Sequence, residues 1–232
     1  MTTLSRADIT PLELATFTFA PDEPNAGEQG VVMAYVVRLA DGVLLFDTGF
    51  GFGSREVEER YHPLARRISD ALAAVGVAVA DVRAVVNCHL HIDHAGQNLA
   101  FPGVPIHVQV AEWRVAHATE HTILEWIDFE SADYRRHAGD YTVLPGIEAL
   151  VTPGHTPGHQ SLVVRTAGGP IVLVGQAAYS VGEWNGEHGA REGRSRAWDR
   201  DAYDASLVRL RALNPIRAYF GHDREAWSAQ ES

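Results

Sequence analysis

The amino-acid sequence predicts an α+β fold in which two β-sheets lie face to face between outer layers of helices. Apolar runs of strand length occur in both halves of the chain and alternate with segments of helical periodicity. Both halves also follow the same order, strands first and a helix afterwards, and no Pro/Gly/Ser-rich linker separates them. We therefore expect one domain over residues 1–232, built as a four-layer αβ/βα sandwich.

The first half is expected to contain a β-hairpin followed by a helix. Val31–Val37 and Val43–Phe46 are apolar runs joined across Asp41-Gly42, a dipeptide that favours the positive φ of a tight turn, so the two strands should be antiparallel. Ser54 is a candidate helix cap, and the helix is expected to resume after Pro63 and to stop at Gly76. Its buried face is predicted to comprise Leu64, Ile68, Ala71, Leu72 and Val75.

The remaining elements follow the same logic. Val82–Cys88 and Val104–Val108 read as buried strands. An aromatic-rich insert at about 111–141 is expected to be mostly helical with an irregular tail. In the second half, strands are predicted at Ile147–Val151, Ser161–Arg165, Ile171–Val174 and Ala218–Phe220, and a helix from about Asp201 to Leu213.

Charge and cysteine content exclude several classes of function. The chain has 19 basic and 30 acidic residues, a net charge of −11, and all of its basic residues are arginine, so lysine chemistry is excluded. A surface this acidic argues against binding to nucleic acid or to an anionic membrane. The single cysteine, Cys88, ends a buried strand and is expected to be a core residue. No signal peptide or membrane span is evident, so a reduced, cytoplasmic location is expected.

The most specific motif lies directly after the strand Val82–Cys88. His89, His91, Asp93 and His94 place four strong metal ligands within six residues. We expect a tight turn and a helix start here, with His89 and His91 projecting to one side while Asp93 and His94 face another. One loop can then serve two neighbouring metal positions.

Two further histidines follow strand ends. His155 lies in the run Thr152-Pro-Gly-His-Thr-Pro-Gly-His159 after the strand Ile147–Val151, and His222 follows the last predicted strand within Gly221-His222-Asp223. Loops at strand ends are where sites in sheet proteins gather. Each signal is weak alone, but together with the histidine run they supply the ligands for two zinc sites.

These motifs resemble the metallo-β-lactamase superfamily, and the resemblance extends over about residues 31–224. The matching residues are Asp47-Thr48-Gly49, His89-x-His91-x-Asp93-His94, His155 and His222. The resemblance implies that His89, His91 and His155 bind a first metal, and that Asp93, His94 and His222 bind a second. It also implies that Asp47 orients a ligand histidine. Two Zn²⁺ per chain are expected, while iron, cobalt or manganese would suit similar ligands.

One position departs from the superfamily pattern. The superfamily usually has an aspartate that bridges both metals where this chain has Gln176. A neutral amide oxygen is a poorer donor than a carboxylate, so the second metal should be held less tightly. Loss of the negative charge also favours the hydroxide form of a bridging water. The sequence alone leaves these opposing effects unranked.

Within the superfamily, the chain looks most like N-acyl homoserine lactonases, which quench quorum signals. The residues that carry this resemblance are the run Thr152–Ser161 and Tyr179. It implies that metal-bound hydroxide attacks the lactone carbonyl, that Tyr179 hydrogen-bonds the carbonyl or the oxyanion, and that Asp93 passes a proton to the leaving oxygen. His159 is expected to support its loop rather than bind metal.

Several alternatives stay open. A thioesterase resembling glyoxalase II, or a β-lactam or other ester hydrolase, would use the same ligands, and Gln176 leaves room for a noncatalytic metal- or ligand-binding protein. The aromatic insert could form an acyl channel together with aromatic and apolar residues of early loops, and any one of these residues could instead complete the core or a dimer contact. The early residues are Phe17, Phe19, Met33, Tyr35, Phe50 and Phe52. The segment Gly182–Asp199 is expected to be a mobile or contact loop with three arginines, and a homodimer is an open possibility.

Overall fold

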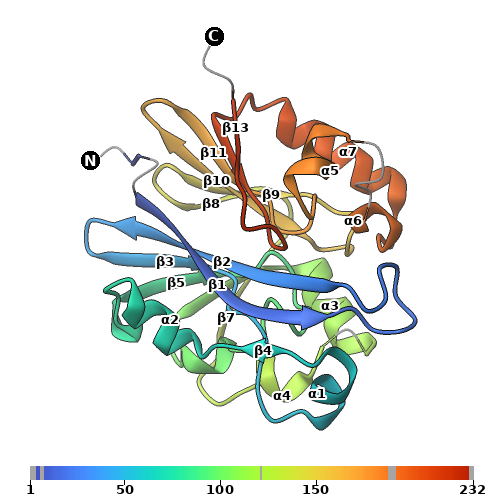
Figure 1. Ribbon diagram of the computed structural model, residues 1–232. Helices are drawn as coiled ribbons and strands as arrows, with labels where there is room; N and C mark the ends of the chain where they lie inside the picture. The colour runs from blue at the N-terminus through green and yellow to red at the C-terminus, as the bar shows by residue number, and fades with distance from the viewer. Residues whose placement is uncertain (1–3, 6–7, 121, 188–191, 230–232) are drawn as a thin grey trace.

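Two mixed β-sheets, one from each half of the chain, form the centre of the molecule (Figure 1). The computed structural model describes residues 4–5, 8–120, 122–187 and 192–229. The seven-stranded sheet has the order β4-β1-β2-β3-β5-β6-β7 and comprises β1 (Ile9–Thr18), β2 (Gln29–Leu39), β3 (Gly42–Phe46), β4 (Leu64–Ala65), β5 (Val82–Val86), β6 (Pro105–Gln109) and β7 (Asp133–His137). The six-stranded sheet has the order β13-β12-β11-β10-β9-β8 and comprises β8 (Tyr141–Leu144), β9 (Ile147–Val151), β10 (Gln160–Thr166), β11 (Gly169–Leu173), β12 (Arg217–Tyr219) and β13 (Trp227–Ser228).

Helices cover the outer face of each sheet (Figure 1). The first half contributes α1 (Arg55–Tyr61), α2 (Ile68–Ala74), α3 (Val110–Ala118), α4 (Leu124–Ile127) and two short 3₁₀ turns, η2 (Val79–Asp81) and η3 (Asn98–Ala100). The second half contributes α5 (Val181–Asn185), α6 (Glu192–Ser195) and α7 (Arg200–Arg211). The layers confirm the predicted αβ/βα sandwich.

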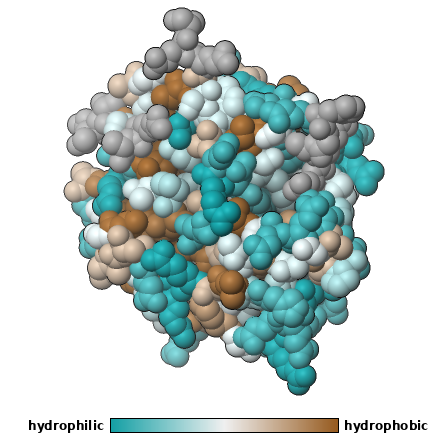
Figure 2. All heavy atoms as spheres, viewed as in Figure 1, coloured by the Kyte–Doolittle hydropathy of each residue, from teal (hydrophilic) through white to brown (hydrophobic). Residues whose placement is uncertain are grey.

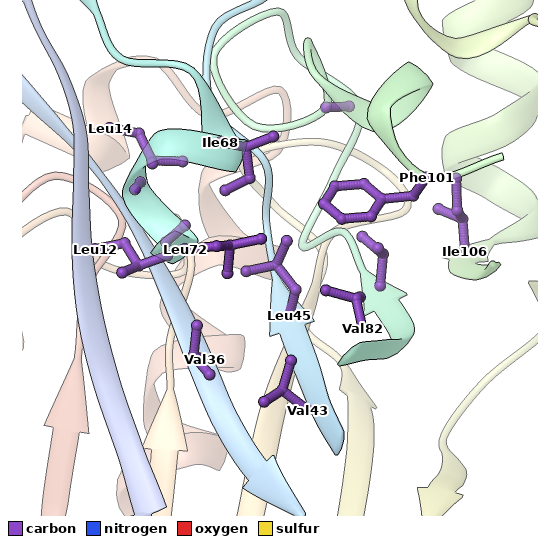
Figure 3. Close-up of a cluster of buried hydrophobic side chains, with 14 of the residues drawn as sticks. Leu12, Leu14, Val36, Val43, Leu45, Ile68, Leu72, Val82, Phe101 and Ile106 are labelled. Carbon is purple, nitrogen blue, oxygen red and sulfur yellow. The ribbon is translucent and has the colours of Figure 1, made fainter. Parts of the chain in front are cut away.

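Strand periodicity explains why the sandwich has separate cores. Successive side chains of a strand point to opposite faces, so Tyr35 and Val36 of β2 enter different clusters. Val36 packs with Ile68 and Leu72 of α2 beneath the first sheet (Figure 3). Tyr35 packs between the two sheets, and its hydroxyl donates a hydrogen bond to the carbonyl of Phe220 at 2.6 Å. The region between the sheets is therefore a packed core.

The predicted antiparallel hairpin is confirmed, but its turn lies one residue earlier than expected. Leu39 of β2 pairs with Gly42 of β3, so the turn residues are Ala40 and Asp41, and the positive φ falls on Gly42, the first residue of β3. Gly42 has φ of +147°, and a Cβ placed there would lie 2.4 Å from the carbonyl oxygen of Asp81. Glycine is therefore required both by the backbone conformation and by the close approach of the chain leading into β5.

The prediction that a helix resumes directly after Pro63 is wrong for the first residues of that segment. Ser54 does cap α1, since its hydroxyl accepts a hydrogen bond from the N–H of Val57. His62 then leaves the helix in the left-handed region, and Leu64–Ala65 pairs with β1 as the short strand β4. Leu64 is 77% exposed rather than part of a buried face, because this strand extends the sheet edge before α2 begins.

Sequence periodicity also misses strands at the edges of the sheets. The insert expected to be helical is helical only as far as Ile127, and β7 follows with the exposed residues Arg135 and Arg136. Charged side chains are common on edge strands, where they hide the strand pattern. The sequence analysis also did not predict β1. This strand contains Pro11, which has no N–H to donate, and β4 pairs with β1 at Ala15 and Thr16, away from this residue.

The visible surface is mostly hydrophilic, with apolar side chains in small groups between polar ones (Figure 2). Of the helices that the structure describes, none combines the length and the apolar character needed to cross a membrane. The segment expected to be a loop at 182–199 contains α6 and most of α5, while Arg191, one of its three arginines, lies outside the described residues.

Candidate metal centre

Three histidines bring ring nitrogens together where β5 and β9 end. Nε2 of His89 lies 2.8 Å from Nδ1 of His91, and Nε2 of His155 lies 3.2 Å and 3.1 Å from these two atoms. Burial lowers the pKa of His89 and of His155 well below the ordinary value, with the neighbouring imidazoles adding to the effect. The rings of His89 and His155 are thus neutral and offer lone pairs, as metal ligands must.

Asp93, His94 and His222 form a second cluster beside the first. Oδ2 of Asp93 lies 3.3 Å from Nε2 of His94 and 3.5 Å from Nε2 of His222. The far nitrogens of both rings are fixed, because Nδ1 of His94 donates to Asp47 at 3.0 Å and Nδ1 of His222 donates to the carbonyl of Val31 at 2.7 Å. Each ring therefore presents Nε2 toward the cluster.

The electrostatics of the second cluster favour positive charge. Burial alone would raise the pKa of Asp93, but the imidazole of His94, with those of His222 and His91, outweighs it and lowers that pKa below the ordinary range. Burial alone would lower the pKa of His94, but Cys88, Asp93 and Asp47 raise it well above the ordinary value. Two carboxylates around buried imidazoles make a suitable environment for a cation.

The donor sets of both clusters fit divalent cations. Three nitrogens about 3.3 Å apart match one face of a tetrahedron with Zn–N bonds of about 2.0 Å, and those of the first cluster lie 2.8–3.2 Å apart. Three such nitrogens cannot all satisfy one another by hydrogen bonds. In the second cluster, Nε2 of His94 is buried without a hydrogen-bond partner among the described residues. The structure thus brings together all six side chains expected to ligate metal.

A buried carboxylate that the sequence reasoning missed connects the two ligand loops of the first cluster. Glu112 of α3 accepts a hydrogen bond from the N–H of Leu90 at 2.8 Å and another from the hydroxyl of Thr156 at 2.6 Å. A Cβ at Gly158 would lie 2.1 Å from the backbone nitrogen of Glu112, so only glycine allows α3 to approach this closely. The sole sequence signal was an acid between apolar neighbours in the aromatic insert.

His159 lies outside both clusters and contacts the loop that follows β11. Its Nδ1 donates to the carbonyl of Thr152 at 3.0 Å, so its Nε2 is free to accept the backbone N–H of Gln176 at 2.9 Å. Burial is the main cause that lowers the pKa of His159 to about 3, which keeps the ring in this neutral tautomer. His159 thereby positions the backbone at Gln176.

Gln176 reaches the second cluster through its side-chain amide. Because Nδ1 of His222 is a donor, Nε2 of that ring is an acceptor, and the amide nitrogen of Gln176 hydrogen-bonds to it. The amide oxygen is buried with no hydrogen-bond partner among the residues described. The amide of Gln176 thus competes for the lone pair that His222 would give to a cation.

Both clusters face one cavity of about 320 Å³. Tyr179 lines it, with its ring centroid 4.8 Å from that of His222 and 5.8 Å from that of His155. Burial raises the pKa of Tyr179 above the ordinary value, so the side chain stays a protonated phenol. Its backbone N–H donates to Glu183 at 2.7 Å, which positions the residue beside the histidines.

The structure divides the candidate channel residues between the cavity, the core and the surface. Phe17, Phe19 and Phe50 do line the cavity, as expected, and Tyr61 joins them. Met33 and Tyr35 instead lie in the core between the sheets, and Phe52 is 40% exposed on the surface. Among the described residues of the aromatic insert, only Glu120 lines the cavity. Arg196, part of the segment expected to be a loop, also lines it. The helix start expected after His94 is replaced by turns.

Comparison with known proteins gives consistent matches. The family model described as the metallo-beta-lactamase superfamily matches residues 27–222. An N-acyl homoserine lactonase from Bacillus sp is 36% identical, with 84% of this chain and 82% of the relative covered. The N-acyl homoserine lactonase AttM of Azorhizobium caulinodans is 31% identical, with 72% and 69% covered.

Solved structures give the same picture. An N-acyl homoserine lactone hydrolase, solved with the product N-hexanoyl-L-homoserine bound at its catalytic metal centre, superposes with a TM-score of 0.79 at 29% identity and covers 96% of this chain and 95% of its own. A mutant of AiiA from Bacillus thuringiensis, with N-decanoyl-L-homoserine at its active site, gives the same TM-score, identity and coverage.

Proposed function

Since the chain belongs to the metallo-β-lactamase superfamily, we propose that it is a metal-dependent hydrolase that opens the ring of N-acyl homoserine lactones. The observation that carries the proposal is the cavity itself, in which both ligand clusters and Tyr179 face a wall of aromatic side chains. A polar lactone ring suits the first part of this cavity and an acyl chain suits the second.

The cations would be held by His89, His91 and His155 in the first cluster and by the carboxylate and two rings of the second. Divalent cations bound there would activate a water molecule and polarise the lactone carbonyl. The aromatic wall excludes other water from the acyl side of the cavity.

The chain's own residues would move protons and stabilise charge. The phenol of Tyr179 donates a hydrogen bond to the carbonyl oxygen as it becomes an oxyanion. Asp93 is ionised, since neighbouring imidazoles lower its pKa. As a carboxylate it has the free oxygen lone pairs to take the proton that the attacking water loses, and it would deliver that proton to the ring oxygen when the C–O bond breaks. The products are a carboxylate and a hydroxyl group on one opened chain.

We further propose that the cations are zinc and that the two positions bind them unequally. Histidine nitrogen and carboxylate oxygen are common zinc ligands, and iron, cobalt or manganese would suit the same donors. The first cluster is complete with three imidazole rings. At the second, a cation must displace the amide of Gln176 from His222 and gains no bridging carboxylate in return.

The function is tested with a hydrolysis panel on the zinc-loaded protein. The substrates are short- and long-chain N-acyl homoserine lactones, a plain γ-lactone, a glutathione thioester and a cephalosporin. We expect the acyl homoserine lactones to have the highest kcat/KM. Preference for the thioester or the cephalosporin would support those activities instead. No turnover at full metal occupancy would point to a noncatalytic binding protein.

A further inference from the structure

Arg196 enters the cavity from the turn that follows α6. Its guanidinium carbon lies 4.2 Å from the ring centroid of Phe19 and 5.9 Å from that of Tyr179. The side chain is only 15% exposed. Packing on the Phe19 ring holds the flat guanidinium in one place, so its donors have fixed directions within the cavity.

Within the described residues, Arg196 uses little of its hydrogen-bonding capacity. A guanidinium has five N–H donors. One of them, on Nη2, donates to the carbonyl of Pro24 at 2.8 Å. Nε is buried and has no partner among the described residues. Nη1 lies 3.9 Å from Oε2 of Glu23, beyond hydrogen-bonding distance. Unpaired donors in a mostly buried charged group are costly, so a ligand in the cavity that brings an acceptor would relieve this cost.

The nearest carboxylate is held away from Arg196 by other donors. Oε2 of Glu23 accepts the N–H of Ala20 at 3.1 Å, and Oε1 accepts the hydroxyl of Tyr61 at 3.3 Å. Glu23 is therefore fixed and does not close over the guanidinium. It still places negative charge in the cavity wall, as Asp93 and Glu120 do. An uncharged acceptor thus suits the position beside Arg196 better than a second anion.

We propose that Arg196 binds the acyl-amide carbonyl oxygen of the substrate and so selects lactones that carry an amide. This inference rests on the proposed lactonase function. With the ring at the histidine clusters, the amide on the ring's α-carbon is the first acceptor outside the ring, and Arg196 borders the same cavity. The aromatic residues Phe17, Phe19 and Phe50 take the chain beyond the amide.

The test compares two lactones that differ in the amide. N-hexanoyl homoserine lactone carries it, and α-hexyl-γ-butyrolactone places an alkyl chain on the same ring carbon without it. Arg196→Met keeps the apolar stem over Phe19 but removes every donor, whereas Arg196→Lys keeps the charge. Arg200→Met is the matched control, because Arg200 is an exposed arginine four residues along the chain that does not line the cavity.

We expect Arg196→Met to lose about 10- to 100-fold in kcat/KM on the amide lactone and less than about threefold on the alkyl lactone. Arg196→Lys should recover part of the loss, and Arg200→Met should match the wild type. Metal content and thermal unfolding are measured for every variant. Calorimetric binding of the ring-opened product, N-hexanoyl homoserine, should weaken in parallel with kcat/KM.

Two results would overturn the proposal. Equal loss on both lactones would mean that Arg196 acts on shared chemistry, for example through Tyr179, and unchanged kcat/KM on the amide lactone would mean that it does not touch substrate. Both leave the lactonase function intact. If the wild-type protein hydrolyses neither lactone, the proposed function itself fails and this selectivity falls with it.

Discussion

The side-chain amide nitrogen of Gln176 hydrogen-bonds to Nε2 of His222, the atom through which that ring would ligate a cation. The contact follows from the backbone, because the N–H of Gln176 is fixed by His159 and the other nitrogen of His222 by Val31. A neutral group is thus held where negative charge would help a second cation most. Metal loading should therefore respond strongly to this one side chain.

Replacing Gln176 with aspartate should strengthen the second cation position. Gln176→Asp removes the amide from His222 and adds a carboxylate, so affinity for the second zinc should rise by roughly tenfold or more. Gln176→Asn is the matched control, because it has the same size as aspartate without the charge. Zinc per chain is measured after dialysis against a competing chelator. Equal zinc retention in wild type and Gln176→Asp would show that the residue does not influence the site.

The orientation of His94 should depend on Asp47. Asp47 has φ of +66°, a left-handed conformation that asparagine also tolerates, so Asp47→Asn changes charge with little backbone strain. Its two oxygens accept from Nδ1 of His94 and from the N–H of Cys88, and an amide can keep only one of these bonds. We expect affinity for the second cation to fall by about 10- to 100-fold. Chelator competition measures it, with Asp41→Asn in the exposed hairpin turn as control.

Removing the hydroxyl of Tyr179 should slow catalysis while leaving the fold unchanged. Loss of one donor to an oxyanion costs about 10²-fold or more in kcat, so Tyr179→Phe should lower kcat more than it raises KM. Burial raises the pKa of Tyr179, and the ratio of wild-type to variant kcat should thus stay constant from about pH 6 to 9. A kcat equal to that of the wild type would remove Tyr179 from the reaction.

The bridge made by Glu112 should contribute measurably to stability. Glu112→Gln places an N–H₂ group opposite one of two donors, the N–H of Leu90 or the hydroxyl of Thr156. Leaving a buried donor unpaired costs about 1–3 kcal/mol, and the free energy of unfolding should fall by that amount. Urea denaturation of the metal-free protein measures it. Glu130→Gln, at an exposed acid of the same insert, serves as control, and equal stability of the two variants would contradict the expectation.

Stability should fall with acid in part through a histidine pair that does not line the cavity. Nδ1 of His107 lies 3.0 Å from Nε2 of His137, and the His137 ring stacks on Tyr141 with centroids 3.4 Å apart. Burial, with His137 and Arg135 adding to it, lowers the pKa of His107 to about 4, although Asp133 opposes the shift. The unfolded chain then binds more protons between about pH 4 and 6.5, so stability drops as pH falls through that window.

His107→Gln should reduce this dependence by the contribution of one histidine, because other buried histidines with a lowered pKa remain. The free energy of unfolding is measured in urea at several pH values between 4 and 7, with excess chelator so that zinc does not contribute. His62→Asn replaces an exposed histidine in a left-handed cap position that asparagine tolerates. Its slope should stay that of the wild type. An unchanged slope in His107→Gln would mean that the pair tolerates protonation.

The sequence predicted the parts of the molecule that are encoded locally. The hairpin around Asp41-Gly42 depends on turn chemistry, and the ligand run from His89 to His94 is contiguous, so both could be read directly. Strand β4 could not, since Leu64–Ala65 is a strand only because β1 lies beside it. The roles of Glu112 and Arg196 could not be predicted either, because they depend on contacts between residues that are distant in the sequence. The family resemblance, in turn, supplied the pairing of distant ligands that periodicity cannot give.

The division of the chain near residue 140 has a consequence for how the two halves are joined. Each sheet is complete within its own half. Each ligand cluster, by contrast, draws on both, since His155 and His222 come from the second half and the other four ligands from the first. Bound cations would therefore link the two halves of the chain at the cavity, in addition to the core that the sheets share. Loss of the cations would weaken the contact between the two sheets at the cavity before it disturbed the pairing of strands within either sheet.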